Sequence, residues 1–222
     1  MIFALFFGLG GAALLLALGF WQLDRLEQKQ ARIAAIEARI AAAPGALPAT
    51  PDPEADRYLP VTVEGQFGAG DILVLSGRKG LGAGYRVIAP FETDDGRRIL
   101  IDRGFVAEAR KSNPRPGGAA RITGNLDWPR ETDRFTPAPD RAAGLWFARD
   151  VPAMAGALGT EPVLLVLRET SQPVPPIGPQ PVDTAGIPND HLGYAITWFS
   201  LAVVWLGMTA IFLRRRRDRG GE

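Results

Sequence analysis

Two uncharged hydrophobic runs, one near each end of the chain, constrain this sequence more than any other feature. Residues 2–23 and 192–213 each hold about 22 residues without a single Asp, Glu, Lys or Arg. At about 1.5 Å per residue, either run would extend about 33 Å as a helix, enough to cross a hydrocarbon core of about 30 Å. Both runs are therefore predicted to be transmembrane helices.

A cleaved signal peptide is the alternative for the first run. Signal peptides carry an apolar core of only about 7–15 residues behind a basic segment, and no basic residue precedes this run. A retained anchor is therefore favoured. The second run is followed by RRRRDR, and the positive-inside rule places such a basic end in the cytoplasm. Nucleic-acid binding is not expected, because the net charge of the whole chain is only +1.

Two spans with a cytoplasmic C-terminus place the N-terminus in the cytoplasm and residues 24–190 outside. That outside space is the periplasm of a bacterium or the intermembrane space of a mitochondrion. No Arg- and Ser-rich transit peptide precedes the first span, which favours the inner membrane of a bacterium. The chain has no cysteine, which excludes disulfides, thiolate metal sites and a thiol nucleophile.

The fold class expected is an α+β membrane protein, in which two transmembrane helices flank a small, mainly antiparallel β-sheet or barrel domain outside the membrane. An Ala-, Glu- and Arg-rich helical extension and a Pro-rich linker follow the first helix. The segments predicted are transmembrane helix 1 (1–23), helical extension (24–43), Pro-rich linker (44–60), periplasmic β-rich domain (61–171), Pro-rich return segment (172–190), transmembrane helix 2 (191–213) and basic cytoplasmic tail (214–222).

Short apolar or alternating segments separated by turn residues predict the strands of the β-rich domain. The strands are expected at VTVEGQF, DILVLSG, GYRVIAPFET, RRILIDRGFV, ARITGNLDW, GLWFARDV and PVLLVLRET. A hairpin turn is expected at DDGRR and a short helix at VPAMAGAL.

Little in the sequence favours catalysis. A Ser-His-Asp triad would have to use the only histidine, His191, at the membrane surface. The Gly-rich segment GRKGLGAGYR lacks the Lys-Ser/Thr pair and the following helix of a phosphate-binding loop, so it is predicted to be a flexible hairpin loop. The chain is therefore not expected to be an enzyme. A membrane-anchored enzyme acting on a periplasmic substrate is the disfavoured alternative.

His191 begins the second span, and aromatic residues share its helical face. Tyr194, Trp198, Ala202 and Trp205 return to roughly the same side of a helix. An aromatic belt at the membrane surface accounts for Tyr194 and Trp198. It does not account for Trp205, which would lie about 20 Å deeper.

The first span carries a stripe of small residues, Gly8, Ala12 and Gly19, that would let another helix approach closely. Its outer end carries Trp21, Gln22, Arg25 and Lys29.

If the spans pack together, Arg25 and Lys29 lie near the level of His191. A histidine on iron and cations on propionates could then hold a tetrapyrrole. The alternative is a histidine at the membrane surface with snorkelling cations.

Four segments resemble the Surfeit locus protein 1 family. GFWQLDRLEQK is similar to the Gly-x-Trp-Gln-x-x-Arg signature of its first span, and NDHLGYAITWFSLA to the Asn-x-His-x-x-Tyr-Ala-x-Thr-Trp-Phe signature of its second. ILIDRGFV and VTVEGQF resemble two of its strands. The chain departs from the family at Phe105, Ala107 and Asp190. The negative charge of Asp190 would favour a protonated His191.

This resemblance implies a cytochrome c oxidase assembly factor that binds haem a and passes it toward oxidase subunit I. Residue by residue, His191 matches the proposed haem ligand. Trp21, Gln22 and Arg25 match the first-span motif, and Tyr194, Thr197 and Trp198 match the second. Propionate binding by Arg25 or Lys29 is our own expectation.

The partners implied are oxidase subunit I, haem a synthase and membrane lipid, with no nucleic acid. The alternative function is a scaffold that holds subunit I or the synthase and binds no haem.

Overall fold

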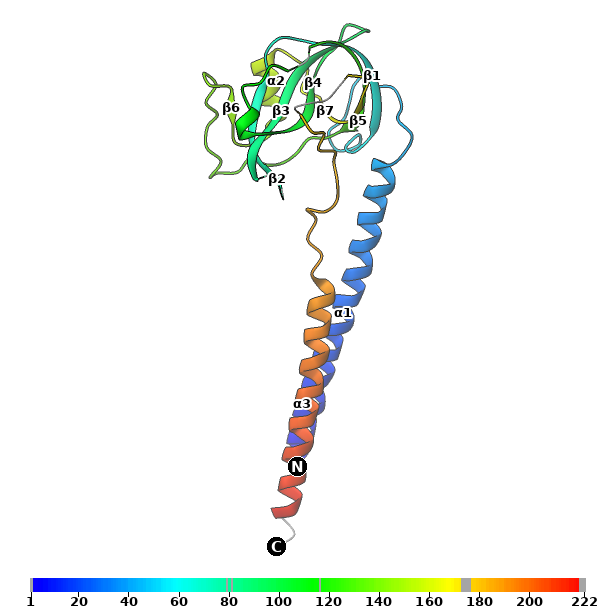
Figure 1. Ribbon diagram of the computed structural model, residues 1–222. Helices are drawn as coiled ribbons and strands as arrows, with labels where there is room; N and C mark the ends of the chain where they lie inside the picture. The colour runs from blue at the N-terminus through cyan, green and yellow to red at the C-terminus, as the bar shows by residue number, and fades with distance from the viewer. Residues whose placement is uncertain (1, 79, 81, 116, 173–176, 220–222) are drawn as a thin grey trace. The chain divides into compact units, whose positions relative to one another are not determined.

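The computed structural model describes residues 2–78, 80, 82–115, 117–172 and 177–219. Parts of the Gly-rich segment (79 and 81), of the return segment (173–176) and of the tail (220–222) lie outside the described residues. The chain forms two units, shown in Figure 1. We call Met1–Ala35 with Thr184–Glu222 the helical unit, and Ile36–Asp183 the β-domain.

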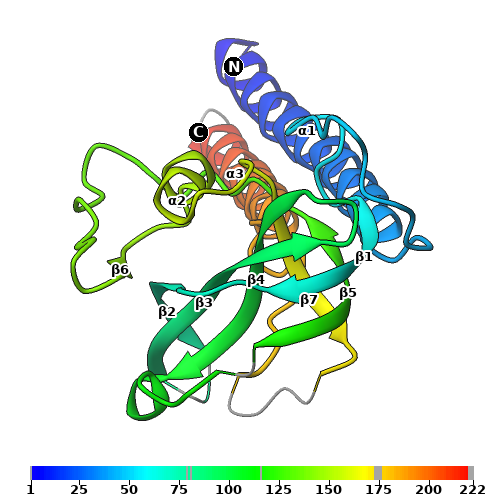
Figure 2. The ribbon, with the colours of Figure 1, turned by 90° about the horizontal axis from the view of Figure 1, so that it is seen from above.

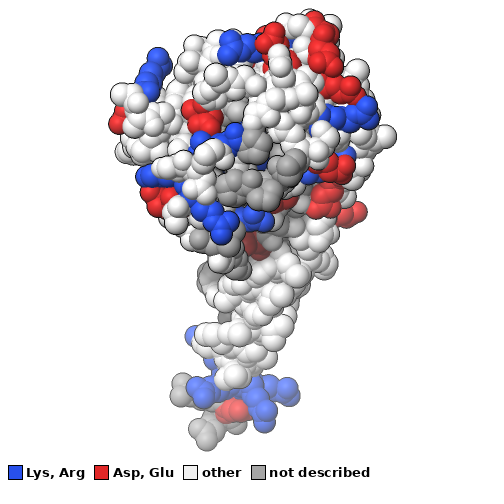
Figure 3. All heavy atoms as spheres, turned by 45° about the horizontal axis from the view of Figure 1, so that its top comes forward, with Lys and Arg blue, Asp and Glu red and all other residues white. Residues whose placement is uncertain are grey.

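Two long apolar helices, α1 (Ile2–Ile40) and α3 (His191–Arg219), make up the helical unit, although the last turn of α1 belongs to the β-domain. They run antiparallel and side by side (Figure 1). Both are long and apolar enough to cross a membrane. In Figure 3, basic side chains gather at one end of this helix pair and most of its visible surface is uncharged.

The β-domain contains a seven-stranded sheet. Its strands are β1 (Pro60–Phe67), β2 (Ile72–Arg78), β3 (Gly82–Thr93), β4 (Arg98–Ala107), β5 (Gly118–Leu126), β6 (Leu145–Trp146) and β7 (Leu164–Thr170). The strand order is β1-β5-β7-β4-β3-β2-β6, and β1 also pairs with β3. Strands β1, β5, β7, β4 and β3 therefore close into a small barrel, seen from above in Figure 2. Among the named strands of the described residues, β2–β6 and β4–β7 pair in parallel and the others are antiparallel. The expected fold class is confirmed.

Strands β4 and β7 are buried on both faces, because each packs into two cores. In β4, Ile99 and Ile101 face the barrel interior, whereas Leu100 faces the helix α2 (Val151–Leu158). In β7, Leu165 faces the barrel interior and Leu164 faces α2. Successive strand residues point to opposite faces, so a strand covered on both sides needs an unbroken apolar run.

The expected hairpin turn and short helix are both present. Gly96 has a left-handed φ of 86°, and the Thr93 N–H donates to the Arg97 carbonyl at 2.8 Å. The strand expected at GLWFARDV is reduced to two residues. The Asp150 side chain accepts a hydrogen bond from the Ala153 N–H at 3.1 Å and starts α2 where the strand was expected to continue.

β4 also carries a fully buried carboxylate, Asp102. Arg86 on β3 donates from Nε to its Oδ2 at 2.6 Å, and Arg149 lies 3.5 Å from the same oxygen. Arg149 also binds Glu131 through Nε at 3.0 Å. Burial by itself raises the pKa of Glu131, but the hydrogen bonds and charge of Arg149 outweigh burial and hold that pKa below its ordinary value. The two arginines and two carboxylates therefore balance in charge.

This charged cluster, with Asp102 and Arg86 at its buried end, holds the return segment on the sheet. Arg86 donates from Nη2 to the Gln180 carbonyl at 2.9 Å. Phe105 and Gly178 exchange two backbone hydrogen bonds, of 2.8 and 2.9 Å. Gly104 has a φ of 109°, and a Cβ there would lie 2.2 Å from the Gly178 carbonyl oxygen. Only glycine allows this close approach.

The last turn of α1, which belongs to the β-domain, is held there by side chains of the sheet. The side-chain amide of Asn125 donates to the Ile40 carbonyl and to the Tyr58 carbonyl, both at 3.0 Å. Arg168 also approaches the Ile40 carbonyl, at 3.3 Å. These contacts satisfy a carbonyl that the end of a helix would otherwise leave without a partner.

Replacing Asp102 with Asn leaves the shape of β4 almost unchanged but deprives Arg86 of its counter-charge. Removing one member of a buried ion pair costs about 3–5 kcal/mol of unfolding free energy. We therefore expect a much lower unfolding midpoint in guanidinium chloride, followed by near-UV circular dichroism of the full chain in detergent. Glu108→Gln, which breaks the exposed Lys111–Glu108 pair, is the control and leaves the midpoint unchanged. Equal midpoints for both variants would contradict this account.

Candidate functional site

The small-residue stripe of α1 packs against α3. A Cβ added at Gly8 would lie 2.2 Å from the Thr209 side chain, and one added at Gly19 would lie 2.6 Å from the Phe199 ring. Ala12 is also buried, with 3% of its surface exposed. The predicted close helix approach is therefore present, and its contacts set the antiparallel register of the two helices.

Trp205 lies in this interface because its indole bonds to backbone. The Nε1–H donates to the Gly8 carbonyl at 2.9 Å, and the ring lies 5.5 Å from that of Phe7. Gly11 leaves room for the indole, since a Cβ there would lie 2.6 Å from it. In an apolar environment an indole N–H without a hydrogen-bond partner costs free energy. The bond to Gly8 removes that cost, which accounts for a tryptophan this far from the start of α3.

Further along the same interface, His191 meets Gln22. Its Nδ1 lies 2.8 Å from the Gln22 Oε1, and Gln22 is only 8% exposed. A carbonyl oxygen can only accept, so Nδ1 carries the hydrogen. In the neutral ring, Nε2 then holds a free lone pair. A hydrogen bond of this kind fixes both the tautomer and the ring orientation, as it does for histidines that bind metals.

The aromatic residues expected beside His191 divide between two environments. Trp198 is half-buried, and its indole N–H is buried without a hydrogen-bond partner among the described residues. Tyr194 is 56% exposed and Trp21 is 50% exposed. The interface thus keeps one unused donor, while two aromatic rings stand at the surface.

The two expected cations lie beyond the start of α3. Arg25 and Lys29 follow Gln22 by three and seven residues, or about 4.5 and 10.5 Å along α1. Arg25 lies 5.6 Å from the Trp21 ring and donates to Gln28 at 3.0 Å. The structure therefore brings Gln22 to His191 directly, whereas Arg25 and Lys29 lie farther along the exposed part of α1. Among the described residues no three His, Cys, Asp or Glu side chains cluster as a metal site.

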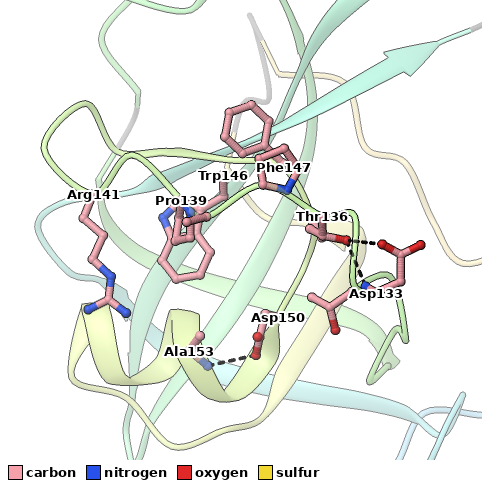
Figure 4. A pocket seen from close by; sticks show the side chains of 12 residues that line it. Asp133, Thr136, Pro139, Arg141, Trp146, Phe147, Asp150 and Ala153 are labelled. Carbon is pink, nitrogen blue, oxygen red and sulfur yellow. Dashed lines mark hydrogen bonds between the residues drawn. The ribbon is translucent and has the colours of Figure 1, made fainter.

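Figure 4 shows a cavity of about 240 Å³ in the β-domain. Two aspartates, Asp133 and Asp150, lie in its wall, and both have structural roles. Asp133 accepts from the Thr136 hydroxyl at 3.1 Å within a tight turn. Asp150 caps α2 through Ala153. These local hydrogen bonds account for both carboxylates in the cavity wall without a ligand.

The main interactions that sequence reasoning missed join distant residues. Gln22 and His191 are 169 positions apart, and Arg86 and Asp102 are 16 apart on different strands. One signal was available, since Asp102 interrupts an apolar strand and a carboxylate there requires a cation. The hydrogen bond of Trp205 to Gly8 had no comparable signal.

The sequence matches the model of the SURF1 family over residues 9–203. A SURF1-like protein of Monosiga brevicollis is 34% identical over 226 residues, covering 92% of this chain and 85% of the relative. A SURF1-like protein of Rickettsia bellii (strain RML369-C) is 30% identical over 226 residues, covering 94% and 90%. Surfeit locus protein 1 of Homo sapiens is 34% identical over 210 residues, covering 83% and 69%. These matches extend across both helices and the β-domain.

Gly11→Leu should separate the two helices, because its side chain would occupy the space of the Trp205 indole. Overpacking of this kind costs about 1–3 kcal/mol. Phe3 and Phe212 line a common hollow between α1 and α3, so a flexible bis-maleimide linker should join cysteines introduced at both positions. We expect a lower cross-linking yield in Gly11→Leu, measured as thiols that remain free in mass spectrometry.

Gly10→Leu is the matched control, since nothing lies within 4 Å of a Cβ at Gly10. The same yield in both leucine variants would contradict the observed packing.

Proposed function

The chain belongs to the SURF1 family, and we propose that it is a cytochrome c oxidase biogenesis factor that binds haem a and assists its insertion into oxidase subunit I. The observation that carries this proposal is the His191–Gln22 hydrogen bond of 2.8 Å, which leaves Nε2 of the neutral ring free for iron. The resemblance of both helix motifs to those of the family supports the same residue.

In this proposal the haem is cargo, and His191 is its protein ligand. The exposed rings of Trp21 and Tyr194 supply flat apolar surface, and a rotation of the Trp198 side chain would present its unpaired, buried N–H to a polar group of the macrocycle. Arg25 and Lys29 are the candidate partners of the propionates. One histidine at the edge of a helix pair suits a carrier, because the cargo stays accessible to the protein that receives it.

We further propose that the protein resides in a bacterial inner membrane with both termini in the cytoplasm and the β-domain in the periplasm. The antiparallel helices support placing both termini on one side, and the arginines that follow Leu213 support the cytoplasmic side. Oxidase subunit I, haem a synthase and membrane lipid are the proposed partners.

The ligand assignment is tested by co-expressing the chain with a haem a pathway and recording the visible spectrum of the purified protein. His191→Ala should lose most of the bound haem a. Gln22→Leu should weaken haem binding about 10- to 100-fold, because it frees the ring that the amide orients. Gln30→Leu, an exposed glutamine on the same helix, is the matched control and should bind like wild type.

Two outcomes would overturn this proposal. Equal haem a in wild type and His191→Ala would remove His191 as the essential ligand. Wild-type protein that carries no haem a but co-purifies with subunit I would favour the scaffold function instead. A lower haem content of the oxidase itself would not separate the two functions, since loss of a scaffold would have the same effect.

The proposed orientation gives a second prediction, which the absence of cysteine makes simple to test. In intact spheroplasts, a membrane-impermeant maleimide should label a cysteine at Ala42, an exposed position just after α1. A cysteine at Asp218, near the end of α3, should react only after the membrane is permeabilised. Labelling of both cysteines in intact spheroplasts, or of Asp218→Cys alone, would contradict the orientation.

A further inference from the structure

Arg103 is a buried arginine that lacks a protein partner. It is only 8% exposed, and its guanidinium lies 4.0 Å from the centre of the Phe67 ring. Within the described part of the chain, it has neither a hydrogen bond nor an ion pair. Arg86, which is equally buried, binds both Asp102 and the Gln180 carbonyl. None of the Arg103 guanidinium nitrogens is both buried and without a partner among the described residues, so these N–H groups must reach open space beside the ring rather than being sealed in protein.

Stacking on Phe67 does not satisfy the guanidinium. An aromatic ring covers one flat face of an arginine, whereas the five N–H groups point outward in its plane. Burial lowers the pKa of Arg103, and the nearby charge of Arg115 lowers it further, while Asp71 acts in the opposite direction. The group nevertheless remains a cation near neutral pH.

A cavity of about 370 Å³ lies beside this guanidinium. Its wall combines the residues that follow β1, Ala89 on β3, Arg103 on β4 and the loop between the 3₁₀ helix η1 (Glu108–Arg110) and β5. Ser112 and Asn113 in that loop add polar groups. Arg103 is thus a buried donor group at the wall of a cavity that can admit a small ligand group.

The charges around the cavity favour one negative group. Asp71 and Arg115 are both in its wall and pair with each other at 2.7 Å. Their charges cancel and leave the single positive charge of Arg103. The Asp71 carboxylate also opposes a ligand with two negative charges. A carboxylate is planar, carries one charge and matches the fork of a guanidinium with two parallel hydrogen bonds.

We propose that this cavity is a binding site for a carboxylate group, held by the free N–H groups of Arg103. The site is in the β-domain and does not depend on the proposed haem function of the helical unit. The carboxylate could belong to a small acid in solution or to an acidic side chain of a protein partner. Both sources share the same chemistry at Arg103, and an experiment separates them.

The test is thermal unfolding of the full chain in neutral detergent, with near-UV circular dichroism as the readout. Sodium acetate represents the free acid, and acetyl-Gly-Glu-Gly-amide represents the side chain. At ten times its dissociation constant, a ligand of the native state should raise the midpoint by about 3–6 °C. Sodium chloride at equal ionic strength should have no such effect. The probe that saturates at the lower concentration identifies the source.

Arg103→Gln should lose the response to both carboxylates, and Arg103→Lys should retain a weaker one because it keeps the charge without the fork. Arg134→Gln is the matched control, since Arg134 also stacks on a phenylalanine, Phe135, but is exposed. It should respond like wild type. If Arg103→Gln does not fold, the contrast between Arg103→Lys and Arg134→Gln decides the question.

The proposal fails if neither carboxylate produces a saturable rise, or if Arg103→Lys responds as strongly as wild type. It also fails if inorganic phosphate, or nanodiscs containing phosphatidylglycerol, stabilise the protein and the carboxylates do not. Those results would assign the site to a phosphate group. Unchanged haem binding in Arg103→Gln would show that this site and His191 act independently.

Discussion

The buried ion pair between Asp102 and Arg86 fixes the chain where it leaves the β-domain. The pair balances a carboxylate that has no access to water, and the same arginine holds the Gln180 carbonyl. The nearby exchange of hydrogen bonds between Phe105 and Gly178 adds two backbone contacts. Where the chain enters the domain, Asn125 holds the last carbonyl of α1. The chain therefore both enters and leaves the β-domain at fixed points.

In the helical unit, close packing determines which polar groups meet. Because Gly8 and Gly19 carry no side chain, α3 approaches α1 closely enough for Trp205 to bond to the α1 backbone. These contacts fix the register, and the register brings His191 to Gln22. The hydrogen bond that sets the tautomer of the histidine thus depends on small residues elsewhere in the helix interface. Substitution of an interface glycine would therefore change the orientation of the His191 imidazole, although the glycine does not contact the ring.

Much of the fold was predictable because its signals are local. The two apolar runs, the Asp-Gly turn and the prolines between segments each act on neighbouring residues, and the expected strands and helices follow them. A strand was expected at β6, but its reduction to two residues was not, because the Asp150 cap begins a helix where that strand would continue.

The contacts of the candidate site were less predictable. The small-residue stripe and His191 could be identified from helical spacing and from the family resemblance. The pairing of Gln22 with His191, and of Arg86 with Asp102, depends on packing between segments that are distant in sequence, which no local pattern encodes.

The strand sequence Asp-Arg-Gly-Phe shows how one short motif can serve two purposes. Successive residues of a strand face opposite sides, so Asp102 enters the charge cluster while Arg103 faces the cavity beside Phe67. Gly104 then admits the return segment, and Phe105 bonds to it. A strand that only stabilised the barrel would have no use for a second buried charge beside Asp102. Arg103 instead has no side-chain partner among the described residues and lies in the wall of a cavity, and that placement is the strongest physical reason to expect a ligand there.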